Sequence, residues 1–188
     1  LFILFLISSS EWLNMTKNLK FKILGIFFLI FSFYSTLYFR EKNLMFFLLI
    51  IITCVSTDLG GYAFGKIFKG PKLIKISPNK TYSGMSGGFL LAIIVSYFFT
   101  TKYASGELVD NIHKSNLQFI FLVLIISSIS QIGDLIISYF KRSSNIKNTG
   151  KIFPGHGGML DRIDGMIFVF PIFYLSSIIF SWKKKLLY

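Results

Sequence analysis

Residues 117–140 read LQFIFLVLIISSISQIGDLIISYF, and this stretch decides the fold class of the chain. It holds a single charged residue, Asp134, and its apolar residues leave no polar face. A helix of this length extends about 36 Å and can cross the roughly 30 Å of bilayer hydrocarbon. We therefore expect a transmembrane helix here and, if the other apolar runs are of the same kind, an all-α, multi-pass transmembrane bundle.

Five more apolar runs occupy much of the remaining sequence, at roughly 1–13, 23–39, 44–64, 84–101 and 164–182. With 117–140 they predict about five full transmembrane helices and one short N-terminal segment. The run 1–13 begins without Met and has the look of a truncated helix. It has no basic region before it and no small-residue cleavage site after it, which argues against a signal peptide. We interpret residues 1–188 as one integral membrane domain.

Composition excludes several other classes of protein. The chain has 188 residues, is 53% hydrophobic, and carries a net charge of +12 from 20 Lys and Arg against 8 Asp and Glu. The long apolar runs exclude a soluble nucleic-acid-binding protein, and the 23 Phe exclude a disordered chain. A single cysteine, Cys54, excludes an internal disulfide framework and a multi-cysteine zinc site.

The positive charges gather in two loops. The first basic loop, 66–82, contains no acid, and the second, 141–163, contains only one, whereas 102–116 is neutral. Their cations are Lys66, Lys69, Lys72, Lys75 and Lys80 in the first loop, and Lys141, Arg142, Lys147, Lys151 and Arg162 in the second. The positive-inside rule places both basic loops in the cytoplasm, as for a bacterial-type plasma membrane protein. Lys183–Lys185 disagree if 164–182 spans once, so a re-entrant last segment stays open.

We single out four acids, Asp58, Asp134, Asp161 and Asp164, that lie in or beside apolar runs, where an unpaired carboxylate costs a few kcal/mol. Asp58 is as compatible with helix packing as with function, because the small-residue patterns 61–65 and 84–88 predict closely packed helices. For Asp134 we favour a functional role. Asp161 and Asp164 lie at the start of the last helix and would share a face of it.

The second basic loop combines residue types that suit phosphate chemistry. Residues 154–158, PGHGG, can form an anion-binding nest at a helix N-terminus. The carboxylates that follow suit Mg²⁺, whose shell substrate phosphates would complete. The alternative is that Asp161 or Asp164 is simply an N-cap.

The first basic loop ends in 77–81, SPNKT, where Pro78 and Asn79 favour a tight turn and Lys80 can contact phosphate. Together the two loops point to phosphoryl or nucleotidyl transfer. The sequence has no P-loop, no H-E-x-x-H and no G-x-S-x-G motif. We interpret His113, alone in the neutral loop, as a bystander.

The residues 138–142 (SYFKR), Lys147, 154–158 (PGHGG) and 161–164 (DRID) resemble the signature of the CDP-diacylglycerol synthases, or phosphatidate cytidylyltransferases. Residues 133–135 and 77–81 are similar to that family's pattern as well, so that the resemblance covers roughly 54–165. One position departs from it: Asn148 stands where the family usually has Asp. We therefore leave Asn148 out of the predicted metal ligands.

The resemblance implies a membrane enzyme that joins CTP to phosphatidic acid and releases pyrophosphate, with Mg²⁺ required and a second cation left open. Its implied catalytic residues are Asp134, Lys147, His156, Asp161 and Asp164, of which Asp134, Asp161 and Asp164 are the implied metal ligands. Implied phosphate-binding residues are Ser77, Asn79, Lys80, Thr81, Lys141, Arg142, Gly157, Gly158 and Arg162. The implied partners are CTP, phosphatidic acid and the lipid bilayer, without nucleic acid, and a homodimer is left open.

Three alternatives remain at this stage. A CTP-dependent kinase of a polyprenol or similar lipid alcohol would release CDP rather than pyrophosphate. A non-enzymatic transporter would use Asp58 and Asp134 within the helical bundle. An inactive fragment is the third, and Asn148 gives it some weight.

Overall fold

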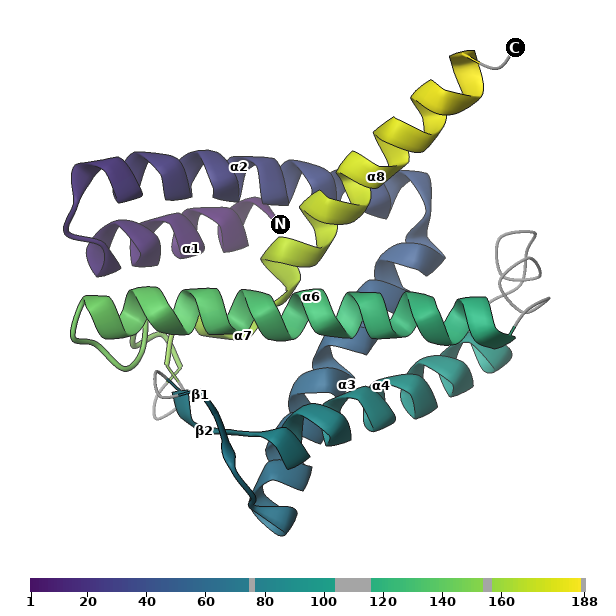
Figure 1. The fold of residues 1–188 in the computed structure, drawn as a ribbon. Helices are drawn as coiled ribbons and strands as arrows, with labels where there is room; N and C mark the ends of the chain where they lie inside the picture. The colour runs from purple at the N-terminus through teal and green to yellow at the C-terminus, as the bar shows by residue number, and fades with distance from the viewer. Residues whose placement is uncertain (75–76, 104–115, 154–156, 187–188) are drawn as a thin grey trace. The chain divides into compact units, whose positions relative to one another are not determined.

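A computed structural model describes residues 1–74, 77–103, 116–153 and 157–186, but not the side chains of 77–79 and 180–186. The described chain is mostly helical, with one short β-hairpin (Figure 1). Its elements in order are α1 (Phe2–Met15), α2 (Leu19–Lys42), α3 (Leu44–Phe68), β1 (Lys72–Ile74), β2 (Ser77–Thr81), α4 (Tyr82–Tyr103), α6 (Asn116–Ser143), α7 (Leu160–Ile163) and α8 (Met166–Leu186).

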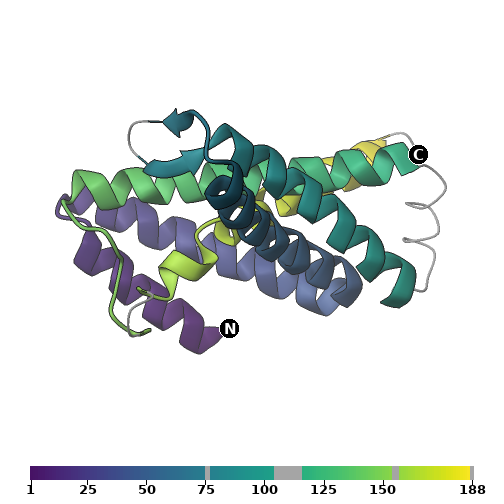
Figure 2. The ribbon, with the colours of Figure 1, turned by 90° about the horizontal axis from the view of Figure 1, so that it is seen from below.

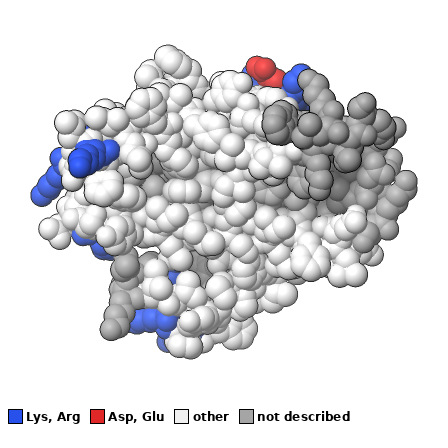
Figure 3. Space-filling view, turned by 45° about the horizontal axis from the view of Figure 1, so that its top comes forward, with Lys and Arg blue, Asp and Glu red and all other residues white. Residues whose placement is uncertain are grey.

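Four helices of the described chain, α2, α3, α4 and α6, are long and apolar enough to cross a membrane. The helix α1 and the 166–179 part of α8 are shorter apolar helices. On the face drawn in Figure 3, uncharged residues cover most of the surface, and Lys and Arg occur in small groups near its edges. The predicted all-α, multi-pass membrane bundle is confirmed, and the protein is an integral membrane protein.

The chain divides into two compact units, each described here by itself. Unit 1 comprises Leu1–Leu44 and Phe140–Tyr188. In it α1 and α2 run antiparallel and side by side (Figures 1 and 2). Trp12 Nε1 of α1 donates a hydrogen bond to the Phe21 carbonyl of α2 at 3.0 Å. Ser32 Oγ joins α2 to α8 by donating to the Ile167 carbonyl at 2.7 Å.

Unit 2, Met45–Tyr139, holds α3, the hairpin, α4 and most of α6. Glycines let the backbones of α3 and α4 touch: a Cβ on Gly60 would lie 2.5 Å from the Gly87 carbonyl oxygen. A Cβ on Gly65 would lie 3.6 Å from the Gly84 Cα. The predicted small-residue packing is therefore confirmed.

Hydroxyl groups supplement this glycine contact inside unit 2. Thr53 Oγ1 and Ser96 Oγ, which join α3 to α4, are 2.8 Å apart, and Thr57 Oγ1 donates to Ser127 Oγ of α6 at the same distance. A buried apolar cluster of Leu49, Ala92, Phe119 and Val123 packs beside them. Hydrogen bonds and close packing are what hold helices together when lipid removes the hydrophobic drive.

The hairpin between α3 and α4 was not predicted. Residues Lys72 and Ile74 of β1 pair antiparallel with Thr81 and Ser77 of β2. Pro78 and Asn79, which were expected to form a tight turn, lie inside β2 instead, so that prediction was wrong. A two-stranded hairpin has only edge strands, and an edge strand tolerates a residue without an N–H group.

Candidate functional site

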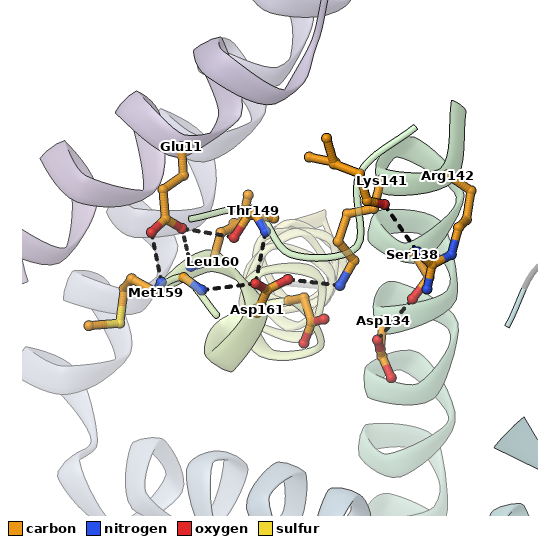
Figure 4. Close-up of polar contacts among 12 residues, drawn as sticks. Glu11, Asp134, Ser138, Lys141, Arg142, Thr149, Met159, Leu160 and Asp161 are labelled. Atoms are coloured by element: carbon orange, nitrogen blue, oxygen red, sulfur yellow. Dashed lines mark hydrogen bonds and ion pairs between the residues drawn. The ribbon is translucent and has the colours of Figure 1, made fainter. Parts of the chain in front are cut away.

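The charged residues of interest form two clusters, one in each unit. The loop cluster, in unit 1, consists of Glu11, Lys141, Thr149, Asp161 and the backbone of 158–160 (Figure 4). The hairpin cluster, in unit 2, consists of Asp58, Lys80 and Asp134. The helix α6 passes through both units and contributes Asp134 to the hairpin cluster and Lys141 to the loop cluster.

Lys141 begins the loop cluster in the last turn of α6, where its positive charge also favours the negative end of the helix dipole. The helix ends because Asn145 adopts a left-handed conformation, with φ of 57°. Arg142 stabilises this end by donating from Nη1 to the Ile146 carbonyl at 3.0 Å. The chain then turns back toward the segment that carries Asp161.

Asp161 accepts three hydrogen bonds, all at the base of the second basic loop. Lys141 Nζ donates to Oδ1 at 2.8 Å, and the backbone N–H groups of Thr149 and Gly158 donate to Oδ2 at 2.9 Å. Burial by itself would raise the pKa of Asp161, but these three donors and the charge of Lys141 outweigh it and lower the pKa. Asp161 is therefore an ionised carboxylate at neutral pH.

Gly157 and Gly158 both lie against the Asp161 carboxylate. Gly157 has a φ of 92°, and a Cβ there would lie 2.6 Å from Asp161 Oδ2. Glycine is thus required at this position for both conformation and space. The N–H of Gly158, which we expected to bind phosphate, is donated to Asp161 in this structure.

Glu11 is the residue of the loop cluster that we did not predict. Its Oε1 accepts from the Met159 N–H at 2.9 Å, and its Oε2 accepts from the Leu160 N–H at 2.8 Å and from Thr149 Oγ1 at 2.9 Å. The residue is only 6% exposed. The sequence did contain a signal, because Glu11 is an acid within an apolar helix and would be costly there without partners.

The hairpin cluster brings the hairpin to α6 within unit 2. Lys80 Nζ forms an ion pair with Asp134 Oδ2, and Ser138 Oγ is 3.4 Å from Asp134 Oδ1. Asp58 of α3 lies close enough to interact electrostatically with both Asp134 and Lys80. The hairpin cluster thus brings two acids and one lysine within electrostatic range of one another.

The other predicted site residues occupy varied positions. Arg142, Lys147 and Arg162 are exposed, whereas Asp164 is buried at the end of α7. Thr81 caps α4, because its Oγ1 accepts from the Gly84 N–H at 3.1 Å. The backbones of Ser77 and Asn79 lie in β2, but their side chains are outside the description, and His156 and His113 lie outside the described residues altogether.

No group of three His, Cys, Asp or Glu side chains with the spacing of a metal site occurs among the described residues. The residues that could hold a cation are therefore pairs of acids. Asp58 and Asp134 lie within electrostatic range of each other, and Lys80 forms an ion pair with Asp134. Asp161 already uses about three of its four lone-pair sites.

Chemically, each cluster combines cations with carboxylates and suits the binding of phosphate groups. The lysines and arginines can neutralise phosphate oxygens, and the acids can hold the lysines or a divalent cation. Neither cluster contains a nucleophilic serine or cysteine paired with a histidine within the described residues. Positioning and charge neutralisation are the catalysis that phosphoryl and nucleotidyl transfer require.

Comparison with known proteins agrees with this chemistry. Residues 1–180 match the cytidylyltransferase family. The chain is similar to a phosphatidate cytidylyltransferase of Rickettsia felis, with 35% identity over 175 residues, 90% of this chain and 76% of the relative. A protein of the same name from Rickettsia typhi is 39% identical over 177 residues, 88% of this chain and 74% of the relative. One from Bacillus subtilis is 38% identical over 136 residues, 70% of this chain and 48% of the relative.

Proposed function

Because the chain belongs to the cytidylyltransferase family, we propose that it is a phosphatidate cytidylyltransferase, which transfers CMP from CTP to phosphatidic acid. The observation that carries this proposal is the loop cluster. In this cluster Lys141, Gly158 and Asp161 form one hydrogen-bonded group, and all three are part of the sequence motifs that resemble the family signature. The Lys141–Asp161 pair lies in a loop region that also carries exposed cations, and this combination is more typical of a phosphate-binding site than of a loop that only connects two helices.

In the proposed reaction a phosphate oxygen of phosphatidic acid attacks the α-phosphorus of CTP. A new P–O bond forms, the bond from the α-phosphorus to the bridging oxygen breaks, and pyrophosphate leaves with the electron pair. A phosphate monoester is largely ionised at neutral pH, so the attack requires no general base. The protein's task is to align two anionic substrates and to offset their charge.

The exposed cations near the loop cluster are proposed to bind substrate phosphates. Arg142, Lys147 and Arg162 are exposed and hence accessible to a soluble nucleotide. Lys141 is proposed to act with them, oriented by Asp161. The glycines 157 and 158 and His156 are retained as candidate contacts of the triphosphate.

We further propose that Mg²⁺ binds at Asp134, with Asp58 as a second oxygen ligand. Mg²⁺ commonly takes one or two carboxylates and fills its remaining positions with water and substrate phosphates, so a pair of acids fits it. The hairpin cluster supports this choice because it brings two acids within electrostatic range of each other beside a lysine that could contact substrate phosphate. When bound, the ion would neutralise charge that develops on the triphosphate. Asp161 and Asp164 remain candidate ligands.

We propose that both basic loops face the cytoplasm, where CTP is found, while the acyl chains of phosphatidic acid stay in the bilayer. The charge distribution of the loops supports this orientation.

The test is turnover by the purified protein in liposomes that contain both phosphatidic acid and a polyprenol, with Mg²⁺ and CTP labelled at either the α- or the γ-phosphate. We expect the α-label in lipid and the γ-label in pyrophosphate. Transfer of the γ-label to a polyprenol would instead indicate a kinase. Ion flux without labelled lipid would indicate a transporter, and no reaction of any kind would contradict the assignment.

The metal proposal has a separate test. Asp134→Asn should reduce transfer at least a hundredfold, and an excess of EDTA should abolish the wild-type reaction until Mg²⁺ is restored. Glu41→Gln, which neutralises an exposed acid at the end of α2, is the matched control and should retain wild-type transfer. Wild-type turnover by Asp134→Asn would exclude this metal site.

A further inference from the structure

Glu11 and Asp161 share the same two segments of the second basic loop. Thr149 donates its N–H to Asp161 and its hydroxyl to Glu11 (Figure 4). On the other segment, Gly158 donates its N–H to Asp161, and the next two residues donate theirs to Glu11. The two carboxylates therefore interlock, and each one joins the residue at which the loop begins to the residues at which it ends.

The fit around Glu11 is too close for chance contact. A Cβ on Gly158 would lie 2.5 Å from both carboxylate oxygens of Glu11, and a Cβ on Gly150 would collide with the same carboxylate. At both ends of the loop, the residue next to the Glu11 carboxylate is thus a glycine, and any larger side chain would clash with it. These contacts join the two ends of the segment 149–158, and at both ends, Thr149 and Gly158, the backbone N–H also donates to Asp161.

The attachment of α1 to α2 does not depend on Glu11. Trp12 Nε1 donates to the Phe21 carbonyl, and the Trp12 ring occupies the space left by Gly25. The Trp12 ring also packs edge-on against Phe140, with centroids 5.1 Å apart. Trp12 therefore holds α1 against α2, and the hydrogen bonds of the buried Glu11 carboxylate go to the two ends of the loop.

We propose that Glu11 is a positioning residue for cytidylyl transfer: it closes the base of the loop 149–158 and thereby holds Asp161 and Lys141 in their working arrangement. The proposal rests on the proposed function. Glu11 contacts Thr149, Met159 and Leu160 rather than substrate, so it acts through the loop and is not itself a catalytic residue.

Glu11→Gln gives a sharp test because it keeps size and shape but replaces one oxygen by an NH₂ group. Both carboxylate oxygens of Glu11 accept from N–H or O–H donors. In either orientation of the glutamine amide, its NH₂ group therefore faces a backbone N–H donor and cannot bond to it. We expect kcat to fall at least tenfold with little change in the KM for CTP. Hydrogen exchange of peptides covering 145–165 should accelerate, while exchange in α2 stays as in the wild type.

Trp12→Phe is the matched control on the same helix. It removes the hydrogen bond to Phe21 but none of the contacts to the loop. We expect a lower melting temperature, unchanged exchange in 145–165, and a kcat within twofold of the wild type. A drop in kcat as large as that of Glu11→Gln would mean that loosening α1 alone explains the effect, and would overturn the proposal.

The remaining outcomes are also decisive. Unchanged exchange in 145–165, or faster exchange there with wild-type kcat, would overturn the positioning role. If Glu11→Gln unfolds throughout, Glu11→Asp, which keeps the charge but is one methylene shorter, is judged by the same two readouts, and unfolding of both variants would make Glu11 a residue of the fold alone. If the wild type forms no CDP-diacylglycerol, the proposed function fails, and the role of Glu11 in transfer fails with it. The exchange experiment would still show whether Glu11 holds the two ends of the loop 149–158 together.

Discussion

At the scale of single residues, the arrangement around Asp161 explains why its neighbourhood in the sequence is so specific. One carboxylate orders a lysine from α6 and two backbone N–H groups from separate ends of a loop. Gly157 must be glycine because of the same carboxylate. A change at any of these positions therefore disturbs several contacts together.

Replacing Lys141 by methionine should reveal the coupling to Asp161. The two side chains are 11% and 10% exposed, so the loss of one leaves a largely buried carboxylate without its ionic partner. We expect a loss of stability of about 3 kcal/mol at neutral pH. Thermal unfolding in detergent measures it, with Lys151→Met, an exposed lysine in the same loop, as the control that should unfold as the wild type does.

The same pair predicts a pH dependence. The pKa of Asp161 is lowered in the folded protein, so its contribution to stability is complete above the ordinary aspartate pKa of about 3.9 and disappears as the pH falls through the lower folded value. The difference in melting temperature between wild type and Lys141→Met should therefore be constant from pH 7 to pH 5 and shrink below about pH 4. A difference that grew on acidification would contradict this assignment.

Lys80 offers a second residue-scale prediction, in the hairpin cluster. Lys80→Met removes the ion pair with Asp134 and a cation proposed to contact phosphate. A charge-assisted contact contributes about 1.5–3 kcal/mol, so we expect transfer to fall about ten- to a hundredfold. Lys72→Met, on the exposed face of β1, removes the same charge from the same hairpin and should have little effect. Equal losses in both variants would indicate only a general electrostatic effect.

At the scale of elements, the glycine contact between α3 and α4 lies near the ends of the two helices that the hairpin connects. Gly60, Gly65 and Gly84 bring the two backbones together, and the hairpin joins the same ends of these helices. The strand β2 then delivers Lys80 to Asp134 within unit 2. The ion pair thus depends on close packing of the helices as well as on its own charges.

Two alanine substitutions separate this packing from helix propensity. Gly60→Ala places a methyl group against the Gly87 carbonyl oxygen and 3.0 Å from the Gly88 Cα, both backbone atoms that cannot turn aside. Gly61→Ala meets only the Gly84 carbonyl oxygen, at an ordinary 3.7 Å. We expect Gly60→Ala to lose about 1–3 kcal/mol of stability and Gly61→Ala to lose none. Thermal unfolding of the two variants side by side is the measurement, and equal melting temperatures would refute the contact.

At the scale of the whole molecule, the lysines and arginines of the described chain lie in loops and near the ends of helices, whereas apolar residues fill the middle of the long helices. The four long apolar helices of the described chain carry few charged residues in their hydrophobic windows. The exposed lysines 72 and 151 lie in the two basic loops instead. A membrane protein arranged in this way has an orientation that its charges predict.

Thiol labelling tests that orientation. Cys54 is the only cysteine of the chain and is buried, and its replacement by alanine provides a background for single cysteines. In inverted vesicles, Lys72→Cys and Lys151→Cys should react with a membrane-impermeant maleimide, whereas Lys114→Cys should react only in right-side-out cells. Reaction of position 151 from outside would reverse the proposed topology.

The membrane-spanning helices could be predicted from sequence because hydrophobic length is a local property that bilayer thickness selects. The α3–α4 contact could be predicted for a similar reason, since glycines spaced four apart mark one helix face. The hairpin could not, because the pairing of 72–74 with 77–81 depends on where α3 and α4 place its two ends. Pro78 favours a turn by its local preference, but it lies within β2, because an edge strand tolerates a residue without an N–H group.

The sequence alone determined that this is a multi-pass membrane protein, that ten of its 20 Lys and Arg lie in two loops, and that residues 138–164 carry the signature of a cytidylyltransferase. Tertiary structure alone decided that Glu11, about 140 residues earlier in the chain, closes the loop that holds Asp161. The physical reason is that hydropathy, charge and motif spacing are local in sequence, whereas a buried carboxylate obtains its donors from whatever segments the packing of α1 brings to it.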